Sequence, residues 1–145
     1  MDPDLLVENE LTRDRLSTLA CRLSDDDLAR DLGEGWTVAV ALAHMAFWDE
    51  RAALLLERYA EGTAQHHIPD WYEDLLNQTL EPQWRALSPR TAADGAVAAA
   101  EHVTRVLRGL DDGLCARLEA HEEGYLLRRF NHRTEHIAQI EAALG

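Results

Sequence analysis

Apolar residues recur at intervals of about 3.6 residues in four long segments of this 145-residue chain, the spacing of one face of an α-helix. The segments run from about residue 4 to 23, 38 to 60, 91 to 110 and 122 to 144. No segment alternates apolar and polar residues for long, and β-branched residues are few, so β-strands are not expected. The pattern therefore predicts an all-α fold.

Capping residues mark where several of these helices should begin and end. Ser24, followed by three aspartates, predicts the start of a short helix that Gly33 ends. Gly35 should break the chain again, and Thr37 should cap the long helix that begins at Val38. Its first half is apolar on almost every side, so we expect this helix to lie deep in the core.

A long connection over residues 63 to 90 separates the second and third long helices. Pro69, Pro82 and Pro89 interrupt it, and residues 70 to 80 should form one short helix within it. Four long amphipathic helices with one such connection predict a four-helix bundle with a long crossover between the second and third helices. We expect these two helices to run parallel, residues 1 to 145 to form a single domain, and no β-sheet to be present.

Charge and composition narrow the classes of partner. A net charge of −13 argues against nucleic acid, because phosphate binding needs a basic surface. The longest apolar run, residues 38 to 48, is too short to span a bilayer, and no basic and apolar signal segment opens the chain. Two cysteines do not make a disulfide framework. We therefore expect a cytoplasmic protein that binds neither nucleic acid nor a membrane.

Two histidines four residues apart, His132 and His136, are the first candidate for chemistry. They lie on one face of the last predicted helix, separated by about 40° around its axis, a spacing at which a helix can chelate one metal ion. Such a pair is more often two polar surface residues, so the motif needs a third partner to carry a prediction.

His44 is the candidate third partner, because it interrupts the apolar run of the second long helix. A buried imidazole must be hydrogen-bonded or ligated, so His44 is either a hydrogen-bonded core residue or a third metal ligand. Three histidine ligands from two facing helices would leave coordination positions open for water or substrate. The remaining histidines have no placed partner: His66 and His67 in the crossover, His102 off the apolar face of its helix, and His121 near the start of the last helix.

Three further side chains project near the histidines and are candidates for a substrate pocket. Trp48 lies one turn after His44 and could form a wall, although a core aromatic is the more common role. Arg129 lies one turn before His132 and could hold an anionic substrate, although a solvated surface arginine is the more common role. Tyr125 lies on the same face and could donate a proton or simply pack. Arg129 and Tyr125 are thus weak catalytic candidates.

The sequence GWTVAVALAHMAFWD (residues 35–49), together with NHRTEHIAQIEAAL (residues 131–144), resembles the DinB-like superfamily. The nearest branch is the metal-binding domain of mycothiol-dependent maleylpyruvate isomerase. Gly35, Trp36 and Thr37 match the entry to the second helix of that family. His44 matches its first metal ligand, and the histidine pair of the last helix matches its second ligand motif.

The resemblance implies a DinB/YfiT-like metalloenzyme fold that binds one divalent ion, zinc or nickel, through three side chains, and it favours a homodimer. Characterised relatives include transferases and isomerases that use mycothiol or bacillithiol, and hydrolase-like resistance proteins. The isomerase has an additional C-terminal domain that we do not expect here, because the sequence ends directly after the predicted bundle. We therefore predict a metal-dependent transferase or isomerase that joins a small-molecule thiol of the mycothiol type to an electrophilic substrate. The alternatives are a non-catalytic metal- or ligand-binding bundle with a stress or resistance role, and a metal-dependent hydrolase.

Overall fold

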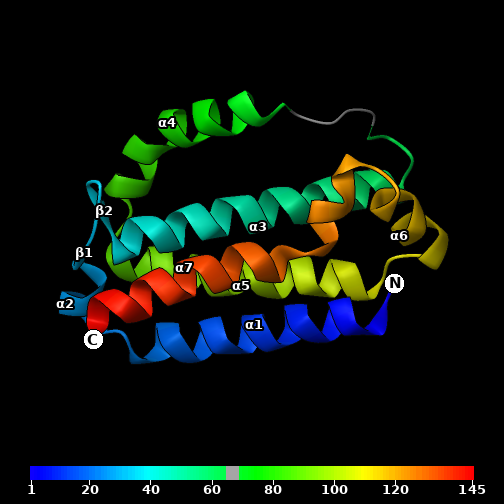
Figure 1. Ribbon diagram of the computed structural model, residues 1–145. Helices are drawn as coiled ribbons and strands as arrows, with labels where there is room; N and C mark the ends of the chain where they lie inside the picture. The colour runs from blue at the N-terminus through cyan, green and yellow to red at the C-terminus, as the bar shows by residue number, and fades with distance from the viewer. Residues whose placement is uncertain (65–68) are drawn as a thin grey trace.

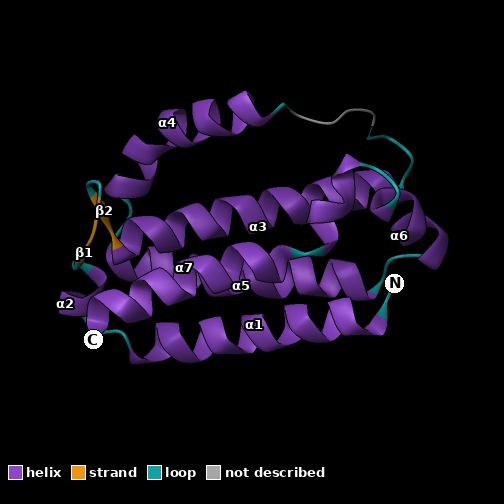
Figure 2. Ribbon diagram, in the orientation of Figure 1, coloured by secondary structure: helices purple, strands orange, loops and turns teal. Residues whose placement is uncertain are grey.

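The computed structural model describes residues 1–64 and 69–145, and this part of the chain is mostly helical (Figure 1, Figure 2), in agreement with the all-α prediction. Four long helices lie side by side: α1 (Pro3–Arg22), α3 (Val38–Ala60), α5 (Pro89–Arg108) and α7 (Arg129–Leu144). The helices α3 and α5 run in one direction, whereas α1 and α7 run in the opposite direction. The parallel pairing of α3 and α5 follows because the helix Asp70–Ala86, which lies between them in the sequence, runs back along α3.

The predicted helix starts are formed by side-chain caps. The hydroxyl of Thr37 accepts a hydrogen bond from the backbone N–H of Val40 at 3.2 Å, and α3 runs from Val38 to Ala60 as predicted. Ser24 and Asp27 form a reciprocal capping box at the start of α2 (Asp25–Leu28). The cap positions therefore follow from local sequence chemistry.

A short β-hairpin between α2 and α3 contradicts the prediction that no sheet is present. Strand β1 (Asp31–Gly33) pairs in antiparallel fashion with β2 (Trp36–Thr37), and α2 ends at Leu28 rather than at Gly33. The reversal uses positive φ angles at Gly33 (93°), Glu34 (54°) and Gly35 (81°), which favour glycine. Strands of three and two residues are too short to show an alternating pattern, so the sequence periodicity missed them.

The helix in the crossover, α4 (Asp70–Ala86), extends beyond the predicted residues 70 to 80 and contains Pro82. Its final turn is held by Trp84, which is 6% exposed and packs against the rings of Trp36 and Phe47. Burial of this large indole offsets the backbone hydrogen bond that the proline removes. Helix α4 lies over α3, on the side away from α1 (Figure 1).

The last predicted helix, residues 122 to 144, is interrupted in the structure. After α6 (Asp112–Glu119), a 3₁₀-helix, η1 (Glu122–Leu127), leads to α7, which begins at Arg129. Leu126 and Leu127 are both fully buried.

The core consists of two apolar clusters separated by a polar layer. One cluster lies at the hairpin end of the long helices and the other at the α6 end. Between them, α1, α3 and α7 contribute a buried polar layer: Asn9, Thr12, Asp49, Arg129 and Arg133. This layer lies beside the predicted histidine site. In the described residues, none of the helices is both long enough and apolar enough to cross a membrane.

Candidate metal centre

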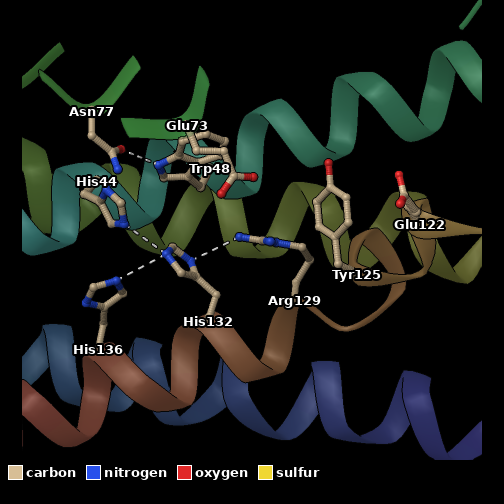
Figure 3. A pocket seen from close by; sticks show the side chains of 9 residues that line it. All are labelled: His44, Trp48, Glu73, Asn77, Glu122, Tyr125, Arg129, His132 and His136. Carbon is tan, nitrogen blue, oxygen red and sulfur yellow. Dashed lines mark hydrogen bonds between the residues drawn. The ribbon is translucent and has the colours of Figure 1, made fainter. Parts of the chain in front are cut away.

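His44 on α3 and the pair His132 and His136 on α7 meet in the structure (Figure 3). The Nε2 atom of His132 lies 2.9 Å from Nε2 of His44 and 3.2 Å from Nε2 of His136. One nitrogen of each ring lies within 4.8 Å of the other two. The structure thus brings together the three residues that the sequence predicted as ligands, from positions 88 residues apart.

The spacing of these nitrogens fits a single divalent ion. Metal–nitrogen bonds of roughly 2.1 Å in tetrahedral geometry place ligand nitrogens about 3.4 Å apart, close to the observed separations. Burial lowers the pKa of His44 to about 3. Burial also lowers the pKa of His132 and His136. All three rings are therefore neutral at pH 7, and neutral imidazole is the form that binds metal.

The second ring nitrogens of the triad have unequal surroundings. His136 Nδ1 lies 2.9 Å from the side-chain oxygen of Gln139, so it donates its proton there and leaves Nε2 free to accept. His44 Nδ1 is buried and has no hydrogen-bond partner among the described residues. His136 therefore matches a ligand that binds through Nε2, and no contact at Nδ1 of His44 in the described residues opposes the same arrangement.

His132 is the exception, because its Nδ1 faces the guanidinium of Arg129. Arg129 Nη2 lies 3.1 Å from this nitrogen, and arginine can only donate, so Nδ1 accepts. In a neutral ring the proton is then on Nε2, directed at the other two histidines. An ion bound at Nε2 of His132 would require the ring proton to be on Nδ1. That N–H would then face the N–H groups of Arg129, and two donors cannot hydrogen-bond to each other. The hydrogen bond from Arg129 thus does not match an ion bound at Nε2 of His132.

Arg129 is buried, which corrects the expectation of a solvated surface arginine. It is 6% exposed, and its Nε donates to Asp49 Oδ1 at 2.9 Å. Arg133 Nε donates to the other oxygen of the same carboxylate at 2.7 Å. We call Asp49, Arg129 and Arg133 the ion trio. The sequence analysis missed Asp49 and Arg133, although an aspartate directly after the apolar run of residues 38–48 is a signal that could have found the first of them.

Arg133 ties the ion trio to the first helix. Its Nη1 donates to the backbone oxygen of Asn9 at 2.9 Å and to Thr12 Oγ1 at 3.1 Å. Arg133 Nη2 and Asn9 Oδ1, a donor and an acceptor, are buried without partners among the described residues. The ion trio therefore connects α7 to both α3 and α1.

A cavity of about 740 Å³ opens beside the histidine triad. Trp48 and Arg129, which were predicted for the substrate pocket, and Tyr125, a weak catalytic candidate, all line it. Trp48 donates from Nε1 to the side-chain oxygen of Asn77 on α4 at 2.8 Å. The sequence analysis did not predict the other residues that line the cavity, which are Glu73 and Asn77 of α4 and Glu122 of η1. Helical projection could not find them, because they come from elements whose packing over α3 and α7 is a tertiary property.

The other histidines lie away from this centre. His102 on α5 contacts two carboxylates of α3, Glu50 at 2.8 Å and Glu57 at 3.4 Å, and the hydrogen bond to Glu50 raises the pKa of its ring. His121 is exposed at the start of η1. His66 and His67 lie outside the described residues.

No family model, no curated protein and no solved structure matches this chain. The fold and the centre therefore define it as a mostly helical protein with three converging histidines that could hold a metal ion.

Proposed function

We propose that the protein is a DinB-like metalloprotein in which His44, His132 and His136 hold one divalent ion. In this proposal α1, α3, α5 and α7 form the four-helix bundle and α4 is its crossover helix. The observation that carries the proposal is the convergence of three neutral imidazoles, with nitrogen separations of 2.9 and 3.2 Å, beside a large cavity. Imidazole ligands suit zinc and nickel among the divalent ions.

We further propose that the protein is a transferase or isomerase that uses a low-molecular-weight thiol of the mycothiol type with an electrophilic co-substrate. A divalent ion held by these three histidines would keep an open coordination position, and it would lower the pKa of a thiol bound there so that the nucleophilic thiolate is favoured. Trp48 and Tyr125 supply aromatic walls for the bound molecules, and Arg129 supplies a fixed positive charge. The cavity volume of about 740 Å³ suits small-molecule partners.

A second copy of the chain is the proposed protein partner, through an interface on α3 and α4. Exposed apolar residues gather on these helices: Leu54, Trp71, Tyr72 and Leu75. Trp84, which the sequence also suggested for this surface, is buried within its own chain and does not contribute. A sedimentation mass near that of one 16.3 kDa chain at micromolar concentration would reject the dimer.

The metal centre is tested by titrating chelator-treated protein with zinc or nickel. We expect one equivalent to bind, and we expect His44→Ala to lose it even though this residue is remote in sequence from the other ligands. His102→Ala is the matched control and should still bind one equivalent. An ion at 100 times its Kd should stabilise the wild type by about 2.7 kcal/mol and leave His44→Ala unchanged. A full equivalent of tightly bound metal in His44→Ala would reject the centre.

The thiol function is tested separately with cobalt-loaded protein. A thiolate that binds Co²⁺ produces an intense charge-transfer absorption band in the near ultraviolet, so we expect such a band when small thiols are added. If the protein binds the metal but no thiol gives the band, the thiol function fails while the metal centre stands.

A further inference from the structure

The cavity beside the histidines has a positive charge fixed in one wall. Arg129 shares the carboxylate of Asp49 with Arg133, so two guanidinium groups are balanced by one carboxylate and the ion trio has a formal charge of +1. The three histidines are neutral and cancel none of it. This side of the cavity therefore favours the anionic part of a ligand.

A carboxylate faces this wall from the other side. Glu73 of α4 is half-buried, and Figure 3 shows its carboxylate directed toward the space between Trp48 and Tyr125. Within residues 1–64 and 69–145 it has no hydrogen-bond or ion-pair partner, whereas most of the cavity's other polar side chains are bonded to protein groups. Glu73 therefore offers an unused acceptor to a molecule in the cavity.

The nearby cation on α3, Arg51, contacts aromatic side chains instead of Glu73. The guanidinium of Arg51 lies over the Trp48 ring, 5.3 Å from its centroid, and its Nη1 lies 3.4 Å from the hydroxyl of Tyr125. It forms no ion pair with Glu73. Partial burial of an unpaired carboxylate costs free energy, and a bound cation would offset that cost. The aromatic side chains that flank Glu73 add a favourable surface for an ammonium group.

On the basis of the proposed function, we propose that the thiol ligand of this centre also carries a free ammonium group, which Glu73 binds. The ligand class is an aminothiol: its sulfur lies toward the histidines and Arg129, and its amine lies toward α4. Glu73 is then a specificity-determining residue, and α4 selects the ligand that the bundle helices hold. The positive wall at Arg129 is complementary to the thiolate, and the negative wall at Glu73 is complementary to the ammonium group.

The test uses cobalt-loaded protein and a series of ω-aminoalkanethiols of increasing length. Each aminothiol is paired with thiols of the same length that end in a hydroxyl or a carboxylate. Kd is measured from the thiolate–cobalt absorption. We expect at least one aminothiol to bind more tightly than both of its partners, and we expect Glu73→Gln to weaken it about tenfold, the scale of one charge-assisted hydrogen bond. Binding of the hydroxyl-terminated thiol should not change.

Asp74→Asn is the matched control, because it removes an exposed carboxylate from the adjacent position of α4 and should leave every Kd unchanged. Circular dichroism should show that both variants keep their helical content. Equal binding of the three thiol classes, or an aminothiol preference that survives in Glu73→Gln, would overturn this inference and leave the thiol function intact. Absence of the thiolate band with every probe would overturn both.

Discussion

The ion trio is buried and the histidine triad is buried at His44 and half-buried at His132 and His136, and these two polar groups at neighbouring levels of α3 and α7 differ in their hydrogen-bond partners. In the ion trio, each oxygen of Asp49 accepts a hydrogen bond from one arginine. In the triad, the ring nitrogens face one another, no carboxylate reaches them, and His44 Nδ1 has no partner among the described residues. The charges of the first group are balanced by its own members, whereas the second directs two acceptor nitrogens and one N–H to one point.

This difference separates a structural role from a binding role. Buried charges that are paired and hydrogen-bonded hold their helices together, and removing one partner leaves the others uncompensated. Buried imidazoles that converge without sufficient donors have an unmet need that an ion can satisfy. Arg129 belongs to the ion trio and also contacts His132 of the triad. Substitutions in the trio, in the triad and at Arg129 can therefore separate the two roles.

The largest expected effect is on the ion trio. Asp49→Asn should lower the free energy of unfolding by about 3–5 kcal/mol, because two buried guanidinium groups lose their only carboxylate partner in the described structure. Urea denaturation of metal-free protein measures this loss. Asp94→Asn, at an exposed position on α5, is the control and should change the free energy by no more than about 0.5 kcal/mol. A loss below about 1 kcal/mol for Asp49→Asn would show that the trio does not hold the helices.

The second effect concerns the triad and pH. Burial lowers the pKa values of the three histidines in the folded state. Near pH 6.5 these rings therefore bind protons in the unfolded chain but stay neutral in the folded protein. Stability of the metal-free protein should therefore fall as the pH drops below about 6.5, and for His44 this continues to about pH 3. For each histidine the slope is about 0.7 kcal/mol per pH unit at pH 6.5, where half of the unfolded rings are protonated, and it approaches about 1.4 kcal/mol per pH unit at lower pH.

Denaturant titrations between about pH 5.5 and 7.5, the range in which histidine takes up protons, measure this slope. His44→Ala should reduce it by about one third, since one of three similar contributions is removed. His102 contributes with the opposite sign: its pKa is raised, so its stabilisation is present below pH 6.5 and is lost as the pH rises through the folded-state pKa. His102→Gln should therefore steepen the slope slightly, and an unchanged slope in His44→Ala would contradict the burial of that ring in neutral form.

The smallest effect is on the contact between the two groups. Arg129→Gln should tighten metal binding roughly 10- to 100-fold, the range known for residues that orient metal ligands. The glutamine oxygen can accept the Nδ1 proton of a metal-bound His132, and one buried positive charge is removed. Competition with a chromophoric chelator measures the affinity. Arg128→Gln, which affects an arginine bonded to Glu119 and Gly124, is the control, and weaker binding in Arg129→Gln would show that the guanidinium supports the ion.

The parts of the centre that the sequence predicted depend on short-range geometry. The Thr37 cap fixed the start of α3, so the direction of His44 followed from the helical period. His132 and His136 share a face because they are four residues apart. A histidine within an apolar run and a histidine pair on a facing helix have few ways to be satisfied together, so their meeting could be inferred without contact information.

The parts that were missed depend on packing between distant segments. Arg129 was expected in solvent because charged residues are rarely buried, and only its pairing with Asp49, 80 residues away, makes burial favourable. Glu73 and Asn77 reach the cavity because Trp84 fixes the far end of α4 on the core. Neither relation leaves a periodic signal in the sequence. The hairpin before α3 was missed for a different reason, since its strands are too short to show a period.

The ion trio also means that the candidate metal centre could be transferred to another protein. Both groups on α3 and α7 are contained in two short stretches, residues 44–49 and 129–136, which run antiparallel. The helical rise of 1.5 Å per residue separates His44 from Asp49 by about 7.5 Å along α3, so pairing Asp49 with the arginines also sets the height of His44 opposite its partners. The ion trio thus aligns the histidines of the candidate centre. The two stretches could therefore be grafted together onto an unrelated antiparallel helix pair. The contacts of Arg133 with Asn9 and Thr12, and the packing of Trp84 against the ring of His44, would require further helices in the host.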